Sequence, residues 1–156
     1  MLINLKELAS GRESEITFDY NMDLSEEEVN FDRPFKNPVR VWGRVADTGV
    51  LVFEAHVNTV MKPRCARCGR EFEREKDLDI RFILSRSDKD SDTDDIFVVR
   101  SDHLETDDIV VPELILSMDM AEYCDPDCKG VCFRCGKNLN DGPCDCEEGQ
   151  LKFEDE

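Results

Sequence analysis

The sequence lacks the long apolar segments that a membrane protein needs. Its uninterrupted apolar runs are only a few residues long, as at 50–53, whereas a spanning helix takes about 20 residues. Lys6 and Glu7 interrupt what would be the apolar part of a secretory signal, and no small-residue cleavage site follows. We therefore expect no membrane insertion and a cytoplasmic location, with the nucleus or a plastid, after processing, as alternatives.

Histidine is also scarce, with only His56 and His103 in the chain. Catalytic zinc usually has His or carboxylate ligands and keeps one position open for water. The sequence contains no phosphate-binding loop, no nucleophile elbow and no acid-base pair placed by a convincing motif. We therefore expect no enzymatic activity, no small-molecule substrate and ordinary polar roles for both histidines.

Positive charge is in short supply, because 20 Lys and Arg residues face 37 Asp and Glu residues, for a net charge of -17. Nucleic acid is bound mainly by basic residues that neutralise phosphates, so the chain as a whole should be repelled by it. Residues 62–76 are the exception, with six basic and three acidic residues. The simpler interpretation of this stretch is a solvated, partly self-paired face. The alternative is a contact with RNA or another partner through Arg64, Arg67 and Arg70.

Alternating apolar residues predict a sheet in a chain of 156 residues, the size of one ordinary domain. Val39, Val41 and Val45 share one face of a strand, and turn residues at 47–49 separate it from a second extended stretch, which predicts a hairpin. An acidic loop is expected at 85–95, where there is nothing apolar to bury between the flanking strands. The expected strands are 16–20, 39–45, 50–61, 78–84 and 96–99.

One helix is expected, starting near Thr106 and ending near Met118. Thr106 and the two acids after it provide an N-cap signal, and Pro112 falls early enough to be tolerated. The helix should bury four apolar residues, Ile109, Leu114, Ile115 and Met118. The predicted fold class is α+β, a mainly antiparallel β-sheet with one helix and a C-terminal zinc-ribbon-like cysteine cluster. We expect a sheet domain at 1–123, a cysteine-rich zinc-binding segment at 124–146 packed on it, and an acidic tail at 147–156.

The eight cysteines form four short-range pairs. In a reducing compartment such pairs are poor disulfide material and good zinc ligands. A glycine follows the second cysteine at Gly69 and Gly136, where a metal-binding knuckle needs the chain to turn through positive φ. Two structural four-thiolate sites are therefore predicted, each with a formal charge of about -2 when it holds zinc. The pairs are Cys65 and Cys68, Cys124 and Cys128, Cys132 and Cys135, and Cys144 and Cys146.

The division of these cysteines between two ions is left open by the spacing. Locality favours Cys132, Cys135, Cys144 and Cys146 as one compact site, with Cys65 and Cys68 completed by Cys124 and Cys128. The rival grouping places the four cysteines from 124 to 135 on one ion and pairs the first knuckle with Cys144 and Cys146. An iron-sulfur cluster also takes four thiolates, but its family spacings differ and zinc is the commoner occupant.

The run CDPDCKGVCFRCGKNLNDGPCDC at 124–146 resembles the YceD family, the large ribosomal RNA subunit accumulation proteins of bacteria and plastids. The likeness extends to INLKEL at 3–8, CARCG at 65–69 and the PEL of the expected helix. Val131 and Phe133 depart from the expected Leu and Pro, and neither can be a metal ligand. The resemblance implies the eight cysteines as ligands and a role in large-subunit ribosomal RNA accumulation, with no established chemistry.

Two functions from different classes follow. The first is a non-enzymatic ribosome-biogenesis factor whose zinc knuckles bind a partner in ribosome assembly. The net charge favours a basic protein partner, and ribosomal RNA remains a candidate through the local basic patch. The second is a redox-sensitive thiol switch or chaperone-like protein, in which oxidation ejects zinc from the 132–146 site. A stable acidic scaffold whose zinc only holds the fold together is a blander version of the first.

Overall fold

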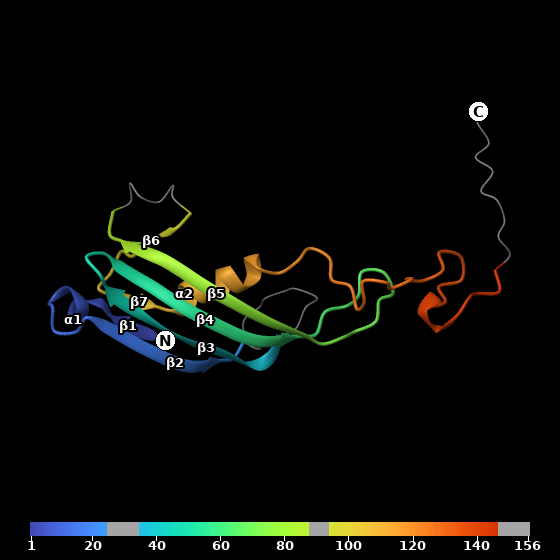
Figure 1. The fold of residues 1–156 in the computed structure, drawn as a ribbon, viewed down its shortest axis with the longest axis horizontal. Helices are drawn as coiled ribbons and strands as arrows, with labels where there is room; N and C mark the ends of the chain where they lie inside the picture. Colours follow the sequence, from blue (N-terminus) through green and yellow to red (C-terminus); the bar gives the residue numbers. More distant parts are fainter. Residues whose placement is uncertain (25–34, 88–93, 147–156) are drawn as a thin grey trace, which may run out of the picture.

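The computed structural model describes residues 1–24, 35–87 and 94–146, and its largest element is a five-stranded sheet (Figure 1). The strand order is β2-β3-β4-β5-β6. Strands β2 to β5 form an antiparallel meander, and β6 pairs with β5 in parallel. A second sheet pairs β1 with β7. The strands are β1 (Leu2–Asn4), β2 (Glu15–Met22), β3 (Phe35–Asp47), β4 (Leu51–Met61), β5 (Arg74–Ser85), β6 (Ile96–Val98) and β7 (His103–Glu105).

The helices are few and short, as the predicted fold class requires. They are α1 (Leu5–Ala9), α2 (Asp107–Leu116) and a single 3-10 turn, η2 (Leu139–Asp141). The prediction of one helix is therefore wrong, since the structure contains α1 as well as α2. The sequence did not indicate α1 because five residues are too few to show a helical period. No helix in the described part of the chain has the length and hydrophobicity needed to cross a membrane.

The hydrophobic core lies on one face of the large sheet. Val39, Val41 and Val45 are fully buried there, as their alternation predicts. They belong to one cluster with apolar residues from α1, α2, β1 and β7. On the same face, Gly43 lets β3 lie close to its neighbours, since a Cβ there would be 2.1 Å from the Glu54 carbonyl oxygen. One face of the sheet is thus closed by the two helices and the small sheet.

The opposite face carries polar side chains that pair across strands. Arg40 is 3.0 Å from Asp19, and Arg44 bonds Glu15 and Glu54. His56 stacks on Trp42 with ring centroids 5.6 Å apart and also contacts Asp79. This histidine is part of the outer face of the sheet, and His103 lies in β7.

Helix α2 is shorter than predicted and its N-terminus is held differently. It ends at Leu116, and Ile115 and Met118 are only half-buried. Thr106 is the N-cap residue and Asp107 and Asp108 lie in the first turn, as predicted, but the Thr106 side chain makes no capping bond to the helix. Its hydroxyl instead donates to the Met1 carbonyl oxygen at 3.1 Å.

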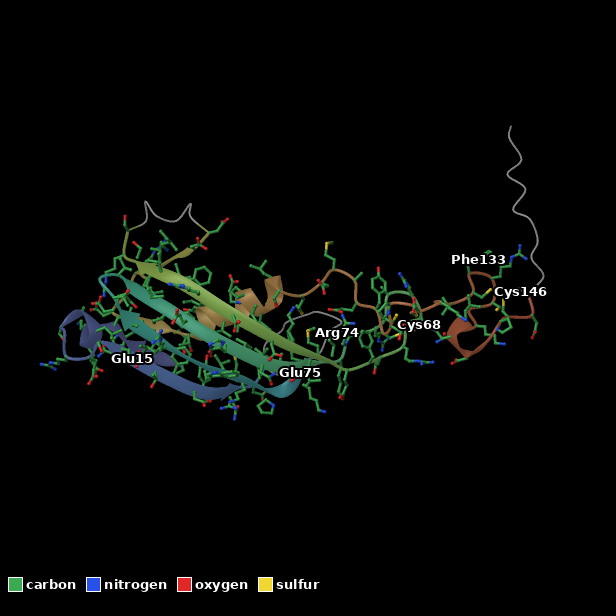
Figure 2. The ribbon with its side chains drawn as sticks, in the orientation of Figure 1. Glu15, Cys68, Arg74, Glu75, Phe133 and Cys146 are labelled. Atoms are coloured by element: carbon green, nitrogen blue, oxygen red, sulfur yellow. The ribbon has the colours of Figure 1, made fainter. Side chains whose placement is uncertain are left out.

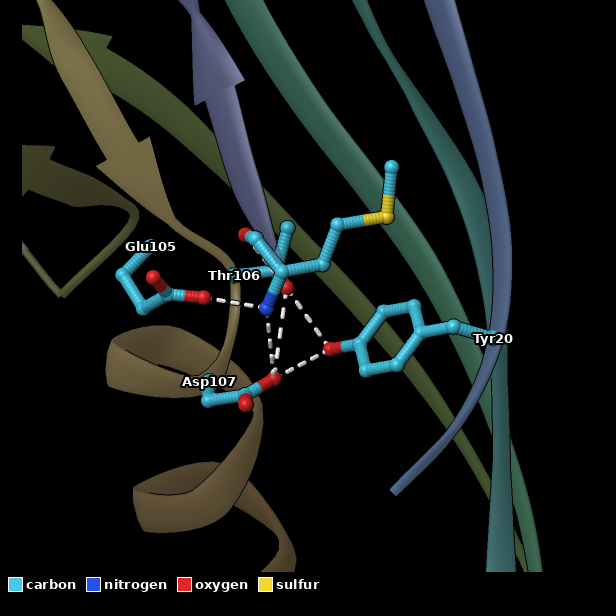
Figure 3. A network of polar contacts seen from close by, with 5 residues as sticks. Tyr20, Glu105, Thr106 and Asp107 are labelled. Atoms are coloured by element: carbon cyan, nitrogen blue, oxygen red, sulfur yellow. Dashed lines mark hydrogen bonds and ion pairs between the residues drawn. The ribbon is translucent and has the colours of Figure 1, made fainter.

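The start of α2 is tied to the sheet by a small polar network (Figure 3). The Tyr20 hydroxyl lies 2.7 Å from Thr106 Oγ1 and donates to Asp107. The Met1 amine contacts the carboxylates of Glu105 and Asp107. Burial is the main reason that the Tyr20 pKa is raised well above its ordinary value, and the bond to Asp107 adds to it. The network fixes Tyr20 in its neutral form.

Of the remaining predictions, the hairpin is confirmed by the antiparallel pairing of β3 with β4. Most of the predicted acidic loop, at 88–93, and the predicted tail at 147–156 lie outside the described residues.

Candidate metal centres

Beyond the end of β4 and β5, the chain forms an extension that we call the cysteine arm. It consists of residues 62–73, which connect the two strands, and residues 122–146, which follow α2 (Figure 1). Figure 2 shows Cys68 nearer to the sheet than Phe133 and Cys146, which lie at the far end of the arm. The first knuckle therefore sits at a sheet end, as the strand pattern predicts.

The arm gathers all eight cysteines into two groups of four. One group is Cys65, Cys68, Cys124 and Cys128, and the other is Cys132, Cys135, Cys144 and Cys146. Within each group the four sulfur atoms lie within 4.8 Å of one another, so each could hold a metal ion. This is the grouping that locality favoured, and the rival grouping is not the one the structure forms.

The two knuckles have the same backbone geometry. Cys65 N donates to the Arg70 carbonyl at 2.9 Å, and Gly69 N donates to the Cys65 carbonyl at 2.8 Å. In the second knuckle, Cys132 and Gly136 make the equivalent bonds, both at 2.8 Å. Gly69 and Gly136 have φ of 71 and 73, a conformation that glycine adopts without strain. Each knuckle is thus a rigid turn that points two sulfurs the same way.

The first group is closed by a clamp between the two parts of the arm. The Arg67 guanidinium donates to the carbonyl oxygens of Pro126 at 2.9 Å and Cys128 at 3.2 Å. It also lies 4.5 Å from the centre of the Tyr123 ring. The predicted domain boundary between residues 123 and 124 would divide this group, because Cys124 and Cys128 lie on one side of it and Cys65 and Cys68 on the other. The clamp holds the cysteine-rich segment against the connection between β4 and β5.

A buried ion pair anchors the base of the arm. The Glu122 side chain is 2% exposed and lies 2.5 Å from the Arg74 guanidinium at the start of β5. Arg74 also donates to the Tyr123 carbonyl at 2.8 Å. A carboxylate this deeply buried needs its partner, since unpaired burial of a charge is costly. The pair fixes where the segment after α2 meets the sheet.

The thiols of the first group differ in acidity. Burial opposes the charged form of Cys65, but backbone N–H groups of Cys124 and of the knuckle donate to its sulfur and lower its pKa to about 6. Burial and bonds to the neighbouring sulfurs raise the pKa of Cys124 to about 12. Some sulfurs are therefore poised as thiolates, while the charge they create disfavours ionising the rest. A bound cation would relieve that repulsion.

The second group shows the same division. Backbone N–H groups of Cys135 and Arg134 lower the pKa of Cys132 to about 6. The pKa of Cys146 is raised to about 12 by the bond with Cys135 and by burial. The second group is more open to solvent, because Cys135 is exposed while Cys65 and Cys128 of the first group are buried.

Asn140 links the two groups and was not among the residues predicted from the sequence. It lies in η2, between cysteines of the second group, yet its Nδ2 donates to Cys128 Sγ of the first group at 3.3 Å. Its Oδ1 accepts from the Lys129 backbone N–H at 2.8 Å, which fixes the amide orientation. The bond to Asn140 is the main reason that the Cys128 pKa is lowered. The asparagines of the C-G-x-N-L-N run were the available signal.

The three arginines proposed as RNA or partner contacts all have partners within the chain. Arg64 pairs with Glu71 at 3.0 Å, and Arg70 pairs with Asp141 at 3.2 Å. Arg67 forms the clamp between the two parts of the arm. All three side chains nevertheless reach the surface. The basic stretch thus has the self-paired character of the simpler interpretation.

Comparison with known proteins gave one result. The model of the family described as large ribosomal RNA subunit accumulation protein YceD matches residues 53–154, which include all eight cysteines. No curated protein and no solved structure matches the chain significantly. The family's description points to the accumulation of large-subunit ribosomal RNA. Because the match covers well over half of the sequence, the chain belongs to the YceD family.

Proposed function

We propose that this chain is a non-enzymatic, zinc-binding ribosome-biogenesis factor of the cytoplasm. It supports the accumulation of large-subunit ribosomal RNA by binding a protein or RNA partner. The observation that carries the proposal is the family match, which spans most of β4 and all of β5, α2 and the cysteine arm. The arm is therefore part of what the chain shares with the family, and we place the partner contact there.

The sulfur geometry supports zinc. Cys65 Sγ lies 3.7 Å from Cys128 Sγ, and Cys68 Sγ lies 3.7 Å from Cys124 Sγ. A tetrahedron with zinc-sulfur bonds of about 2.3 Å has its sulfurs about 3.8 Å apart. A disulfide would need about 2.05 Å. The first group thus has the spacing of a closed structural zinc site, and the second is built from the same knuckle.

Bound zinc would stabilise the arm, which has too few buried apolar residues to form a hydrophobic core of its own. Exposed polar residues dominate the arm, and three of its few buried residues are Cys65, Cys128 and Cys132. A structural zinc contributes about 10–16 kcal/mol of apparent binding energy, which is as large as the stability of a whole domain. Four thiolates fill the coordination sphere, so the ion would act as a crosslink that holds the arm rigid for a partner.

A complementation experiment tests the proposal. Deletion of the gene should lower large-subunit relative to small-subunit ribosomal RNA, and the wild-type gene should restore the ratio. Cys65→Ser and Cys135→Ser should fail to restore it, each having lost one of two zinc ions measured by elemental mass spectrometry. Asp145→Ser is the matched control, because it changes an exposed residue between two ligands and leaves every thiol in place. An unchanged RNA ratio after deletion would refute the proposal.

A second candidate, the zinc thiol switch, is favoured by the exposure of Cys135. Two thiolates of the second group would transfer two electrons to hydrogen peroxide and form a disulfide, while two protons from solvent complete two water molecules and zinc is released. Mild peroxide should then release one zinc per chain, detected with a chromogenic chelator, and dithiothreitol with added zinc should reverse it. If peroxide releases no zinc, or releases both ions together with loss of the fold, the switch is wrong.

A further inference from the structure

We infer that the tip of the second knuckle is a contact for single-stranded RNA, with Phe133 as the surface on which a base stacks. The inference rests on the proposed function and names a partner contact that is particular to this chain, because Phe133 departs from the residue expected at its position in the family. It moves the RNA contact from the first knuckle, where the sequence had suggested Arg64, Arg67 and Arg70, to residues 129–137. The tip is defined as Lys129, Val131, Phe133, Arg134 and Lys137.

The first observation is an aromatic side chain held out in solvent. Phe133 is 80% exposed, and Figure 2 shows it at the far end of the arm, away from the sheet. It lies between two ligands of the second group, on a turn fixed by the bonds of Cys132 and Gly136. A rigid turn carrying an exposed ring loses little conformational freedom when it binds. Nothing in the core explains a large apolar side chain at this position.

The second observation is the local charge. Residues 128–140 contain three basic residues, Lys129, Arg134 and Lys137, and no Asp or Glu, in a chain of net charge -17. The Arg134 guanidinium lies over the Phe133 ring, 5.6 Å from its centre. The three cations are opposed by the formal charge of about -2 on a zinc-filled second group and by the exposed carboxylate of Asp145 between two of its cysteines.

An exposed ring beside cations fits a nucleotide better than a protein surface. Single-stranded RNA presents unstacked bases, which stack on aromatic and guanidinium planes, and phosphates that need positive charge. An apolar protein contact would call for a broader apolar patch, whereas Val131, at 44% exposed, is the other large apolar side chain exposed in 124–146. The acidic body of the chain would confine RNA to the arm by repelling it elsewhere.

The test is fluorescence anisotropy of the full-length, zinc-loaded chain with labelled oligouridylate and oligoadenylate of about 12 nucleotides. Phe133→Leu keeps the apolar bulk and removes the aromatic face, so it should raise the Kd by about 5- to 100-fold. Phe133→Tyr should bind as the wild type does. Arg134→Gln should reduce the slope of log affinity against log salt by about 0.7, the value for one phosphate contact on a single strand. Met120→Ala is the matched control, because this side chain is 99% exposed and lies outside 129–137.

In the binding assay, two outcomes overturn the inference: the wild type binds neither oligonucleotide, or Phe133→Leu binds as tightly as the wild type. Zinc content and circular dichroism of each variant show that the arm is intact. Complementation separates this failure from failure of the proposed function. If Phe133→Leu restores the ribosomal RNA ratio of a deletion strain, the inference falls and the proposed function stands. If Phe133→Leu restores it but Phe133→Ala does not, the tip is an apolar contact for a protein.

Discussion

The bond from Asn140 to Cys128 allows a sharp test of the first metal centre. Asn140→Ala removes the Nδ2 donor, which lies 3.3 Å from the sulfur. Asn140→Asp keeps an oxygen that can accept from the Lys129 backbone N–H and turns an anionic oxygen toward the thiolate. We therefore expect zinc affinity of the first group to fall in the order wild type, Asn140→Ala, Asn140→Asp.

The size of the effect follows from the kind of bond. A hydrogen bond to a charged group contributes about 1.5–3 kcal/mol, and loss of a residue that supports a metal ligand typically lowers metal affinity by about 10- to 100-fold. We expect a loss in that range for Asn140→Ala and a larger one for Asn140→Asp. The pH dependence has a definite sign. Because Asn140 is the main cause of the lowered Cys128 pKa, its removal raises that pKa, and the first zinc is lost at a higher pH than in the wild type.

The assay is competition with a chromogenic zinc chelator at a series of pH values, with the two sites resolved by their different affinities. Asn58→Ala is the matched control, since its amide donates to Asp77 and Glu75 on the sheet, away from both cysteine groups. If both Asn140 variants retain the first zinc as the wild type does, the bond has no role in ligation. If they lose only the second zinc, Asn140 serves its own segment, and the link between the two groups is wrong.

Three further predictions concern stability. A strong chelator should remove zinc from the second group before the first, because Cys135 is exposed and Cys65 is buried; hydrogen exchange should then rise first in 131–146, and the opposite order would contradict the geometry. Gly43→Ala should lower the free energy of unfolding in urea by about 3 kcal/mol or more, because its Cβ meets backbone at 2.1 Å. Gly49→Ala meets nothing within 4 Å and should lose only the about 1–2 kcal/mol of a positive-φ position. Since the Tyr20 pKa is raised in the folded chain, its contribution to stability should be complete below about pH 10, the ordinary pKa of tyrosine, and fall as the pH rises above it. Tyr20→Phe should be less stable at neutral pH and lack this alkaline loss, and equal alkaline slopes would count against the network.

The sheet could be read from the sequence because its strands are half-buried. Val39, Val41 and Val45 face the core while Arg40 and Arg44 face solvent, and this alternation specifies strand, face and partner at once. Short elements carry no such signal. Helix α1 is five residues long, and β1 and β7 are three each, stabilised by pairing between distant segments. The parallel pairing of β6 was also missed, because only three residues of β6 meet the end of β5.

The cysteine grouping was predictable and its surroundings were not. Locality favoured the arrangement found, since nearby thiols lose less entropy when they meet. The clamp by Arg67 and the bond from Asn140 depend on how two loops approach each other in space. Local charge likewise suggested that Arg64 and Arg70 were available for an RNA or partner contact. Their acidic partners, Glu71 and Asp141, lie seven and 71 residues away, so a count of charges along the sequence does not show the pairing.

The pairing of Cys65 with Cys128 and of Cys68 with Cys124 determines when the first group can be completed during synthesis of the chain. These partners are separated by 63 and 56 residues. At about 5–20 residues per second, the first knuckle waits about 3 to 13 s for its partners, while the 14 residues from Cys132 to Cys146 take about 1 to 3 s. During that wait the sulfurs of Cys65 and Cys68 are open to oxidation and to capture by other metals. Folding of the β4 and β5 hairpin in that interval would hold the two sulfurs in their final orientation before the remaining ligands emerge.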